Sequence, residues 1–394
     1  MYNLHLSPEQ VEFRDTVRDF VDDEVKPVTL KADRLDLSDR TLPVEVLRKA
    51  SRMGLRTLAL PEDMGGVGAD ALTCCIITEE LAVGDTDVAA VLAETSSLGL
   101  RLFAAMTAEQ RARFGQTFLE DDDYHLALAC REPGDDSALG INYHRPAPDM
   151  RLATTAARDG DHWIINGAKD CVANAPIAKL IAVEAQTDKG PALFLIPRET
   201  PGFGIDATQH TMGLHGTGHA FLTYDNMAVP DKYRLGEVGH GLEVALFFLD
   251  YSRVSLSNSM VGLAQRALDE AVRFSKRRTT FGKAIASRPQ IQTHIATMQA
   301  DIEAARHLVA HAALLCEQGK DFTAQAATAK LFNLNMIGRV TDLSLRVHGG
   351  WGYTREAVIE RIYRDARGFW FEEGTAEIQQ LVVARYVLDK TQEV

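Results

Sequence analysis

The chain has 394 residues, 46% of them hydrophobic and 25% charged, a composition typical of a globular protein with two or three packed units. Its 55 acidic and 42 basic residues give a formal net charge of −13, which argues against nucleic-acid binding because that function requires a basic surface. An anionic substrate would therefore need local arginine or lysine side chains.

The cysteine pattern and the hydropathy indicate the compartment. No CxxC pair occurs, and an odd, scattered set of cysteines is typical of free thiols in a reducing environment. The first residues lack a basic segment followed by an apolar run, and no window reaches eighteen consecutive apolar residues. We therefore expect a cytoplasmic protein without a membrane span. The five cysteines are Cys74, Cys75, Cys130, Cys171 and Cys316.

Residues 1–123 are predicted to form an N-terminal α-helical domain. Ser7 is a suitable cap for a helix that starts with Pro8, and an amphipathic pattern follows. The segment 61–66, PEDMGG, interrupts the helices. The predicted helices cover residues 8–25, a segment around Leu47, residues 72–83 and a segment that begins near Val88.

Residues 124–235 are predicted to form an antiparallel β domain. Short apolar runs at 180–185, 192–197 and 221–230 are separated by turn signals. Asp159-Gly160 and Asn166-Gly167 can adopt the positive φ angles that tight turns require.

Residues 236–394 are predicted to form a C-terminal four-helix bundle. Apolar residues recur at steps of three and four from Met260 to Phe274, and similar patterns cover 290–317, 321–348 and 375–390. The order α, then β, then α gives an α+β fold class.

Several common site signatures are missing or weak. The strings GxGxxG, GxxxxGK[ST] and HExxH do not occur, which removes the main support for nicotinamide–Rossmann, P-loop and zinc-protease functions. His307 and His311 have a spacing that can hold a metal, but without a third ligand an exposed helix face is favoured. Glu79 and Glu80 point in different directions on a helix, so we assign them to the surface. We predict no metal site.

The segment 346–380 carries the most informative chemistry. Glu373, Gly374 and Thr375 form a short break before a new helix, with Thr375 as its expected N-cap. Phe369, Trp370 and Phe371 precede this break, and an apolar environment raises the pKa of a carboxyl toward that of a useful base. The glycines at 349, 350 and 352 would let a bulky ligand approach the backbone.

These residues resemble the acyl-CoA dehydrogenase family, and the resemblance covers nearly the whole chain. Its C-terminal signature matches Gly349-Gly350-Trp351-Gly352-Tyr353, Arg364-Asp365-Ala366 and Glu373-Gly374-Thr375. Further matches are PEDMGGVGAD (61–70), EELA (79–82), MGLHGTGHAFLTYDNMAVP (212–230) and RRTTFGKAI (277–285).

The resemblance implies FAD-dependent α,β-desaturation of an acyl-CoA thioester. Glu373 would abstract the α-proton while a hydride passes to flavin N5. A minority of relatives place the base on an earlier helix, where this chain has Ser252, which cannot act as a base. The resemblance also implies electron transfer to an electron-transferring flavoprotein, and a homotetramer in which Arg278, Thr280 and Phe281 contact the flavin of a neighbouring subunit.

The full set of site residues implied by the resemblance is large. Flavin contacts are expected from Arg131, Ser137, Cys171, Ala173, Arg278, Thr280, Phe281, Gln292, Arg346, Gly349, Gly350, Thr375 and Glu377. Substrate contacts are expected from Ser137, Asp250, Arg253 and Gly374.

Several positions depart from the family pattern. Arg131 stands where a threonine is usual, Cys171-Val172-Ala173 replaces a typical Trp-Ile-Thr, and about ten extra residues fall at 138–150. These changes keep open an alternative function, a flavin oxidase or monooxygenase of the same fold that acts on a non-CoA substrate. A flavin-binding protein with a regulatory role is a second alternative, but it would not need the Glu373 carboxylate. The sequence does not identify the acyl group.

Overall fold

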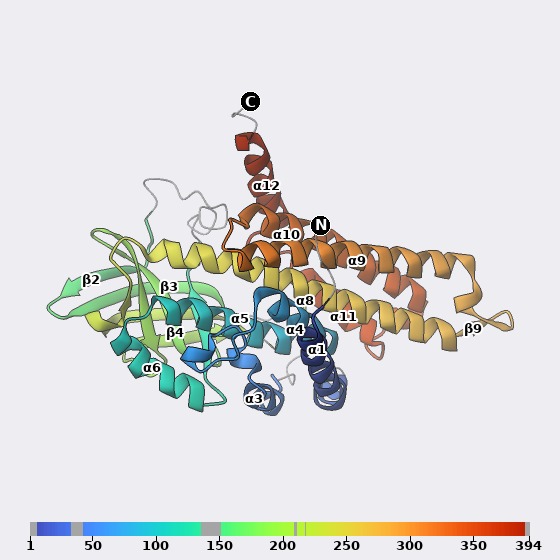
Figure 1. The fold of residues 1–394 in the computed structure, drawn as a ribbon, viewed down its shortest axis with the longest axis horizontal. Helices are drawn as coiled ribbons and strands as arrows, with labels where there is room; N and C mark the ends of the chain where they lie inside the picture. Colours follow the sequence, from blue (N-terminus) through green and yellow to red (C-terminus); the bar gives the residue numbers. More distant parts are fainter. Residues whose placement is uncertain (1–5, 33–41, 135–150, 209–210, 217, 391–394) are drawn as a thin grey trace.

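The computed structural model describes residues 6–32, 42–134, 151–208, 211–216 and 218–390. Figure 1 shows a β domain at one end of the molecule and a helical body at the other, with the long helix α8 running from one to the other. Ser137, a predicted flavin and substrate contact, and the extra segment 138–150 lie outside the described residues.

The N-terminal part is helical, as the apolar periodicity predicted. Ser7 caps the first helix, since its hydroxyl accepts the backbone N–H of Gln10 while the Gln10 side chain accepts the N–H of Ser7. The helices are α1 (Pro8–Phe20), the π-helical η1 (Val21–Val25), α2 (Lys26–Ala32), α3 (Val44–Arg52), η3 (Leu55–Thr57), η4 (Glu62–Met64), α4 (Ala71–Gly84), α5 (Thr86–Ala105) and α6 (Ala108–Glu120).

The first helix is longer than predicted. The prediction ended it at Val25, but the chain stays helical to Ala32 after a π-helical turn. Val21 and Val25 are both buried, and Gly84 of α4 accommodates them, because a Cβ there would lie 2.7 Å from Val21 Cγ1. Val21 and Val25 are four residues apart and so share one helix face, which packs against α4 at Gly84.

The assignment of Glu79 and Glu80 to the surface was wrong. Arg306 of α9 donates to Glu79 at 2.7 Å, and Arg18 of α1 donates to Glu80 at 2.5 Å. The two carboxylates therefore join α4 to two other helices. His307 is exposed and its Nδ1 contacts the Glu303 carbonyl at 2.7 Å, and the described ranges contain no group of three or more potential metal ligands.

The middle part forms a mixed sheet in the order β6-β7-β3-β2-β4-β5-β8. Most pairings are antiparallel, as predicted, but β1 runs parallel to β4, because the chain between them crosses over through β2 and β3. The strands are β1 (His125–Ala129), β2 (Thr155–Asp159), β3 (His162–Ala173), β4 (Ala178–Thr187), β5 (Gly190–Pro197), β6 (Phe203–Thr208), β7 (His219–Pro230) and β8 (Arg234–Leu235), with η5 at Asp231–Tyr233.

The C-terminal part is again helical. The elements are α8 (Gly241–Arg277), β9 (Thr279–Thr280), β10 (Lys283–Ala284), η6 (Ile285–Ser287), α9 (Pro289–Glu317), α10 (Thr323–His348), η7 (Gly349–Tyr353), α11 (Val358–Gly368) and α12 (Ala376–Lys390). One buried apolar core joins α8, α9, α10 and α11.

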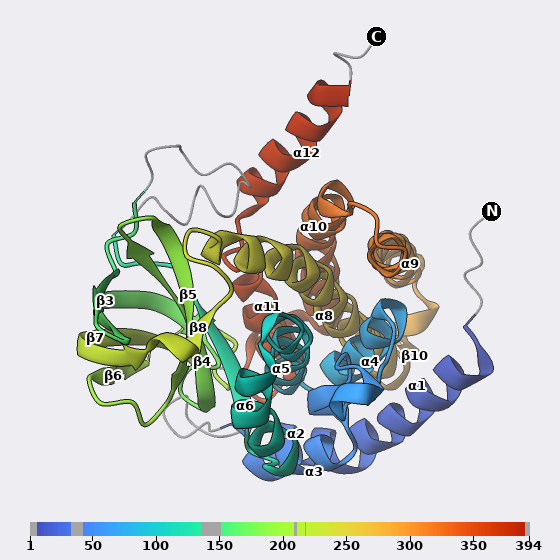
Figure 2. The ribbon, with the colours of Figure 1, turned by 60° about the vertical axis from the view of Figure 1, so that its left-hand side comes forward.

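The last predicted helix of the bundle occupies an unexpected place. α12 packs against α10, and Figures 1 and 2 show its far end extending away from the helical body, while α4 of the N-terminal part packs against α8 and α9. Leu381, Val387 and Leu388 of α12 are largely exposed. The apolar period of 375–390 therefore predicted the helix but not the place of its far end.

Among the described helices, α5 is long and apolar enough to cross a membrane, judged by length and composition alone. Its most apolar stretch of 18 residues has a mean hydropathy of 1.4. The helix packs against β1, α4 and α8, and 61% of that stretch is buried within the protein. A buried core helix has the same composition, so the packing accounts for its hydropathy.

Candidate active site

A cavity of about 720 Å³ lies between α5, α8, the β domain and the segment before α12. A cavity of this size, lined mainly by apolar groups with a few polar ones, is typical of a cofactor or substrate site. Its wall includes Ala90, Ala93, Glu94 and Ser97 of α5, Arg131 and residues 170–173 of the β domain, residues 211–214, Ser252, Ser255 and Ser259 of α8, and Phe369 and residues 371–375.

The turn that carries Glu373 has an uncommon backbone. Glu373 has a φ of +46° and Gly374 a φ of +92°, and positive φ is costly for a residue with a side chain. A Cβ at Gly374 would lie 2.8 Å from Gln379 Nε2, which donates to the carbonyls of Glu373 and Gly374 at 3.2 and 3.1 Å. This close approach explains why glycine follows the acid.

Lys330 of α10 lies under the same turn. Its side chain is fully buried, and Nζ donates to the carbonyl of Gly374 at 2.9 Å and to the carbonyl of Glu372. Two backbone carbonyls of the turn therefore accept hydrogen bonds from the Lys330 ammonium. These hydrogen bonds stabilise its buried positive charge. Lys330 therefore fixes the backbone from which the Glu373 side chain enters the cavity.

Only one of the two oxygens of the Glu373 carboxyl has a hydrogen-bond partner among the described residues. The Ser252 hydroxyl donates to Oε1, whereas Oε2 is buried and has no hydrogen-bond partner among the described residues. Burial raises the pKa of Glu373 to about 7, and the Lys330 ammonium, the Ser252 hydroxyl and the Arg253 guanidinium act in the opposite direction. The geometry provides a carboxylate that can accept a proton near neutral pH.

Two predicted substrate contacts, Asp250 and Arg253, lie beneath the cavity wall rather than on it. Arg253 is fully buried; it pairs with Asp250 at 3.3 Å and donates to the Glu373 carbonyl at 3.3 Å. Asp250 also accepts the hydroxyl of Thr323 at 2.6 Å. In this arrangement they support the Glu373 turn from α8.

The β-domain wall contains three predicted flavin contacts, Arg131, Cys171 and Ala173. Arg131 is largely exposed, with its guanidinium 3.9 Å from Asp170. Cys171 has a φ of +51°, an uncommon conformation that is typical of functional sites.

The loop 211–214 is held against the cavity by a buried ionic network. The Asp365 carboxylate accepts the N–H of Leu214 at 2.8 Å and pairs with Arg361 at 3.1 Å. Arg361 also pairs with Asp85 at 3.0 Å, next to the start of α5. This network links the helical parts of the chain to the loop that closes one side of the cavity.

Comparison with known proteins places this site in a family. The chain matches the family models for the acyl-CoA dehydrogenase N-terminal domain (residues 7–121), middle domain (147–227) and C-terminal domain (239–388). The chain belongs to the acyl-CoA dehydrogenase family. It is therefore a flavoprotein oxidoreductase, as the resemblance predicted.

Similar proteins span almost the whole acyl-CoA dehydrogenase chain. The mitochondrial short-chain specific acyl-CoA dehydrogenase of Bos taurus is 34% identical over 381 residues, 95% of this chain and 89% of the relative. The caffeyl-CoA reductase-Etf complex subunit CarC of Acetobacterium woodii is 32% identical over 393 residues, 98% and 100% of the two chains. The structure of butyryl-CoA dehydrogenase from Megasphaera elsdenii has a TM-score of 0.90, 30% identity and the same coverage.

The other predicted flavin contacts of this acyl-CoA dehydrogenase that fall within the described residues lie outside the cavity wall, except Thr375. Arg278, Thr280 and Phe281 are at the far end of the helical body, around the β9–β10 hairpin in Figure 1. Phe281 is 95% exposed. Within one chain the structure does not bring these residues to Glu373. Gln292, Arg346, Gly349, Gly350 and Glu377 are likewise exposed and do not line the cavity.

Sequence reasoning missed three residues of the site. Lys330 was predicted only as part of a helix, although a lysine among alanines and leucines is an unusual core residue. Ser252 was dismissed as a base, and its role as a hydrogen-bond donor to Glu373 was not considered. Glu94 was overlooked, although it is the only acid between Asp87 and the end of α5.

Replacement of Ser252 by alanine is expected to raise the pKa of Glu373, because it removes a donor that stabilises the carboxylate. If Glu373 is the base that the sequence predicts, the rate of flavin reduction by substrate should rise as Glu373 loses its proton, and the midpoint of this rise should move upward by about one pH unit. Stopped-flow measurements of the flavin-reduction rate over a range of pH values give this midpoint. Ser257→Ala, a buried hydroxyl on the same helix that donates to Arg253, is the control and should leave the midpoint in place.

Proposed function

We propose that the protein is an FAD-dependent dehydrogenase that introduces an α,β double bond into an acyl-CoA thioester, with Glu373 as the base. The observation that carries the proposal is the unpaired, buried Oε2 of Glu373 on the wall of a large cavity. Removal of the α-proton of a bound thioester requires a base that is shielded from water and has a pKa near neutrality, and burial raises the pKa of Glu373 to about 7.

The residues around the cavity fit a flavin. His219, on the β-domain side of the wall, has a buried Nδ1 without a partner among the described residues, so a bound group can satisfy it. Arg131, Cys171, Ala173 and Thr375 would hold the cofactor from this wall. FAD, when bound, supplies the acceptor for the hydride that leaves the β-carbon.

The remaining side chains keep the base in place and in its ionised form. Lys330 and Arg253 hold the turn through its carbonyls, and Ser252 orients the carboxylate. The backbone N–H of Glu373 has no acceptor within the described ranges, and we infer that it donates to the thioester carbonyl. A donor at that oxygen stabilises the negative charge that develops when the α-proton leaves.

We infer a homotetramer and an electron-transferring flavoprotein as partners. The exposed aromatic side chains at the far end of the helical body, Phe281, Trp351 and Tyr353, and the apolar face of α12 would be covered by neighbouring subunits. A neighbour would also bring its Arg278, Thr280 and Phe281 to the flavin. The similar protein CarC is named as a subunit of a complex with Etf, which supports that electron acceptor.

Anaerobic mixing of the FAD-loaded protein with a panel of acyl-CoA thioesters tests the function. We expect bleaching of the visible flavin absorbance by at least one short thioester such as butyryl-CoA or isobutyryl-CoA. If no acyl-CoA reduces the flavin while the protein binds FAD stoichiometrically, the proposed dehydrogenation is refuted.

A flavin oxidase or monooxygenase acting on a non-CoA substrate is the second candidate. The cavity wall has Cys171 and Ala173 at the positions where the family usually has Trp and Thr. The prolyl acyl carrier protein oxidase AnaB is also similar in structure, with a TM-score of 0.88 and 26% identity. Rapid oxygen consumption by the reduced protein in the absence of a flavoprotein acceptor would favour this candidate.

A further inference from the structure

The cavity contains an acidic side chain that the proposed reaction does not use. Glu94 lies on the cavity face of α5 with Ala90, Ala93 and Ser97, at the three- and four-residue steps of a single helix face. The other three side chains are small and uncharged. Glu94 is therefore the one ionisable group that α5 presents to the cavity.

The Glu94 carboxyl has no hydrogen-bond or ion-pair partner among the residues that the structure describes. The nearby Ser97 hydroxyl is already engaged, since it donates to the backbone carbonyls of Ala93 at 2.6 Å and Glu94 at 3.2 Å. Burial raises the pKa of Glu94 well above its usual value, and the charges of Glu373 and Glu372 raise it further. The part-buried Glu94 carboxyl therefore lies on the cavity wall without a compensating partner among the described residues, which leaves it available to a ligand.

The cations around the cavity interact with other groups. The Lys330 ammonium donates to backbone carbonyls of the Glu373 turn, and the Arg131 guanidinium faces Asp170. The Arg367 guanidinium lies over the Trp370 ring, 4.7 Å from its centroid. In the part of the chain that the structure describes, no cation is left to pair with Glu94.

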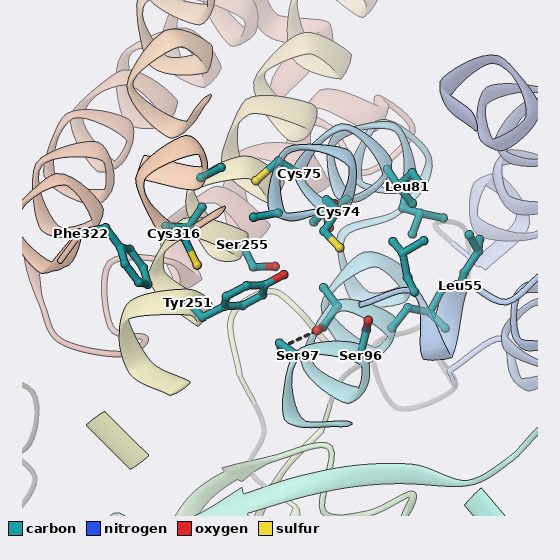
Figure 3. Close-up of a pocket in the computed structure, with 18 residues that line it drawn as sticks. Leu55, Cys74, Cys75, Leu81, Ser96, Ser97, Tyr251, Ser255, Cys316 and Phe322 are labelled. Carbon is teal, nitrogen blue, oxygen red and sulfur yellow. Dashed lines mark hydrogen bonds between the residues drawn. The ribbon is translucent and has the colours of Figure 1, made fainter. Parts of the chain in front are cut away.

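Little space is left next to the cavity on the side of Ala93 and Ser97. Figure 3 shows a second chamber behind Ser97 and Ser255, which line both spaces together with Ala93. This chamber has a volume of only about 30 Å³, room for about two water-sized groups. Tyr251 and Phe322 line it as well. An acyl chain is therefore expected to end close to Glu94.

We propose that Glu94 is a specificity-determining residue that binds a protonated amine on a short acyl group. The inference rests on the proposed function, because it names the substrate class of the same cavity. A hydroxyl could share one hydrogen bond with the Glu94 carboxyl, but it carries no charge that would favour the ionised form of Glu94 beside Glu372 and Glu373. An ammonium group supplies both the donor and the opposite charge.

Binding of three thioesters of nearly equal size tests this inference. β-Alanyl-CoA, butyryl-CoA and 3-hydroxypropionyl-CoA differ only in an ammonium, methyl or hydroxyl end group. Calorimetry on the FAD-loaded Glu373→Gln protein, in which they bind without reacting, gives the affinities. We expect β-alanyl-CoA to bind at least about tenfold more tightly than butyryl-CoA, the effect of one charge-assisted hydrogen bond.

Adding Glu94→Gln to that protein should abolish the preference for β-alanyl-CoA. The control is Glu109→Gln, which removes the same charge from the exposed face of α6 and should leave the preference intact. The inference is overturned if β-alanyl-CoA has no advantage, if 3-hydroxypropionyl-CoA binds most tightly, or if Glu94→Gln leaves the ratio unchanged. Bleaching of the unmodified protein by butyryl-CoA reports separately on the proposed function, so the two failures are distinguishable.

Discussion

The Glu373→Gln protein is expected to bind FAD and acyl-CoA normally but to lose flavin reduction by substrate, with a rate at least about 10³-fold lower. Glutamine keeps the size of the side chain and an oxygen that can accept the Ser252 hydroxyl, so the turn is preserved. What is lost is the acceptor at the buried Oε2 position. Anaerobic stopped-flow spectroscopy of the flavin band measures the rate directly.

Glu372→Gln is the matched control for this experiment. Glu372 also lines the cavity next to Glu373, and burial raises its pKa to about 6, so it is a neighbouring carboxyl that could replace Glu373 as the base. We expect the Glu372→Gln protein to keep most of its reduction rate, because its Ser252–Glu373 hydrogen bond is intact. Retained bleaching in Glu373→Gln together with its loss in Glu372→Gln would transfer the role to Glu372.

The Lys330→Met protein is expected to show a pH profile displaced upward by more than about one unit, and a reduction rate at pH 7 at least about tenfold lower. The sign follows from the charges: burial raises the pKa of Glu373 to about 7, and the Lys330 ammonium, whose own pKa burial lowers to about 7, opposes that rise. Without the cation the carboxyl keeps its proton to higher pH, so the base form is scarce at neutrality. The rate should recover as the pH increases.

Lys169→Met separates this effect from a general loss of stability. Lys169 is a second fully buried lysine, paired with Glu132 at 2.9 Å in the β domain. Removing one partner of such a pair destabilises a fold by about 3–5 kcal/mol, so both variants should unfold at lower temperature. Only Lys330→Met should shift the pH midpoint. A rate that is lower at every pH with an unchanged midpoint would reduce Lys330 to a purely structural role.

The local pattern of the sequence predicted the elements and the position of the acid. Thr375 directly precedes α12, and Gly374 follows Glu373 because the turn leaves no room for a Cβ at that position. These are properties of a few consecutive residues, which a sequence displays directly. The same holds for the Ser7 capping box and for the Asp159-Gly160 turn between β2 and β3. The prediction of a turn at Asn166-Gly167 was wrong, because this pair lies within β3 at a register shift.

The surroundings of the acid could not be predicted in the same way. Ser252, Lys330 and Glu373 are 78 and 43 residues apart along the chain, and only the packing of α8 against α10 brings them together. Apolar periodicity assigns a helix its buried face but does not choose its neighbour. For this reason the pattern of 375–390 was assigned to the bundle, whereas the far end of α12 extends away from it.

The sequence by itself determined the family, the order of helical and β parts, and a carboxylate at the start of the last helix, because these depend on residue type and spacing. The tertiary structure decided which groups surround that carboxylate, how far its pKa rises, and that Glu94 faces the same cavity. Burial and charge are sums over atoms from distant segments, so they exist only once the chain has folded.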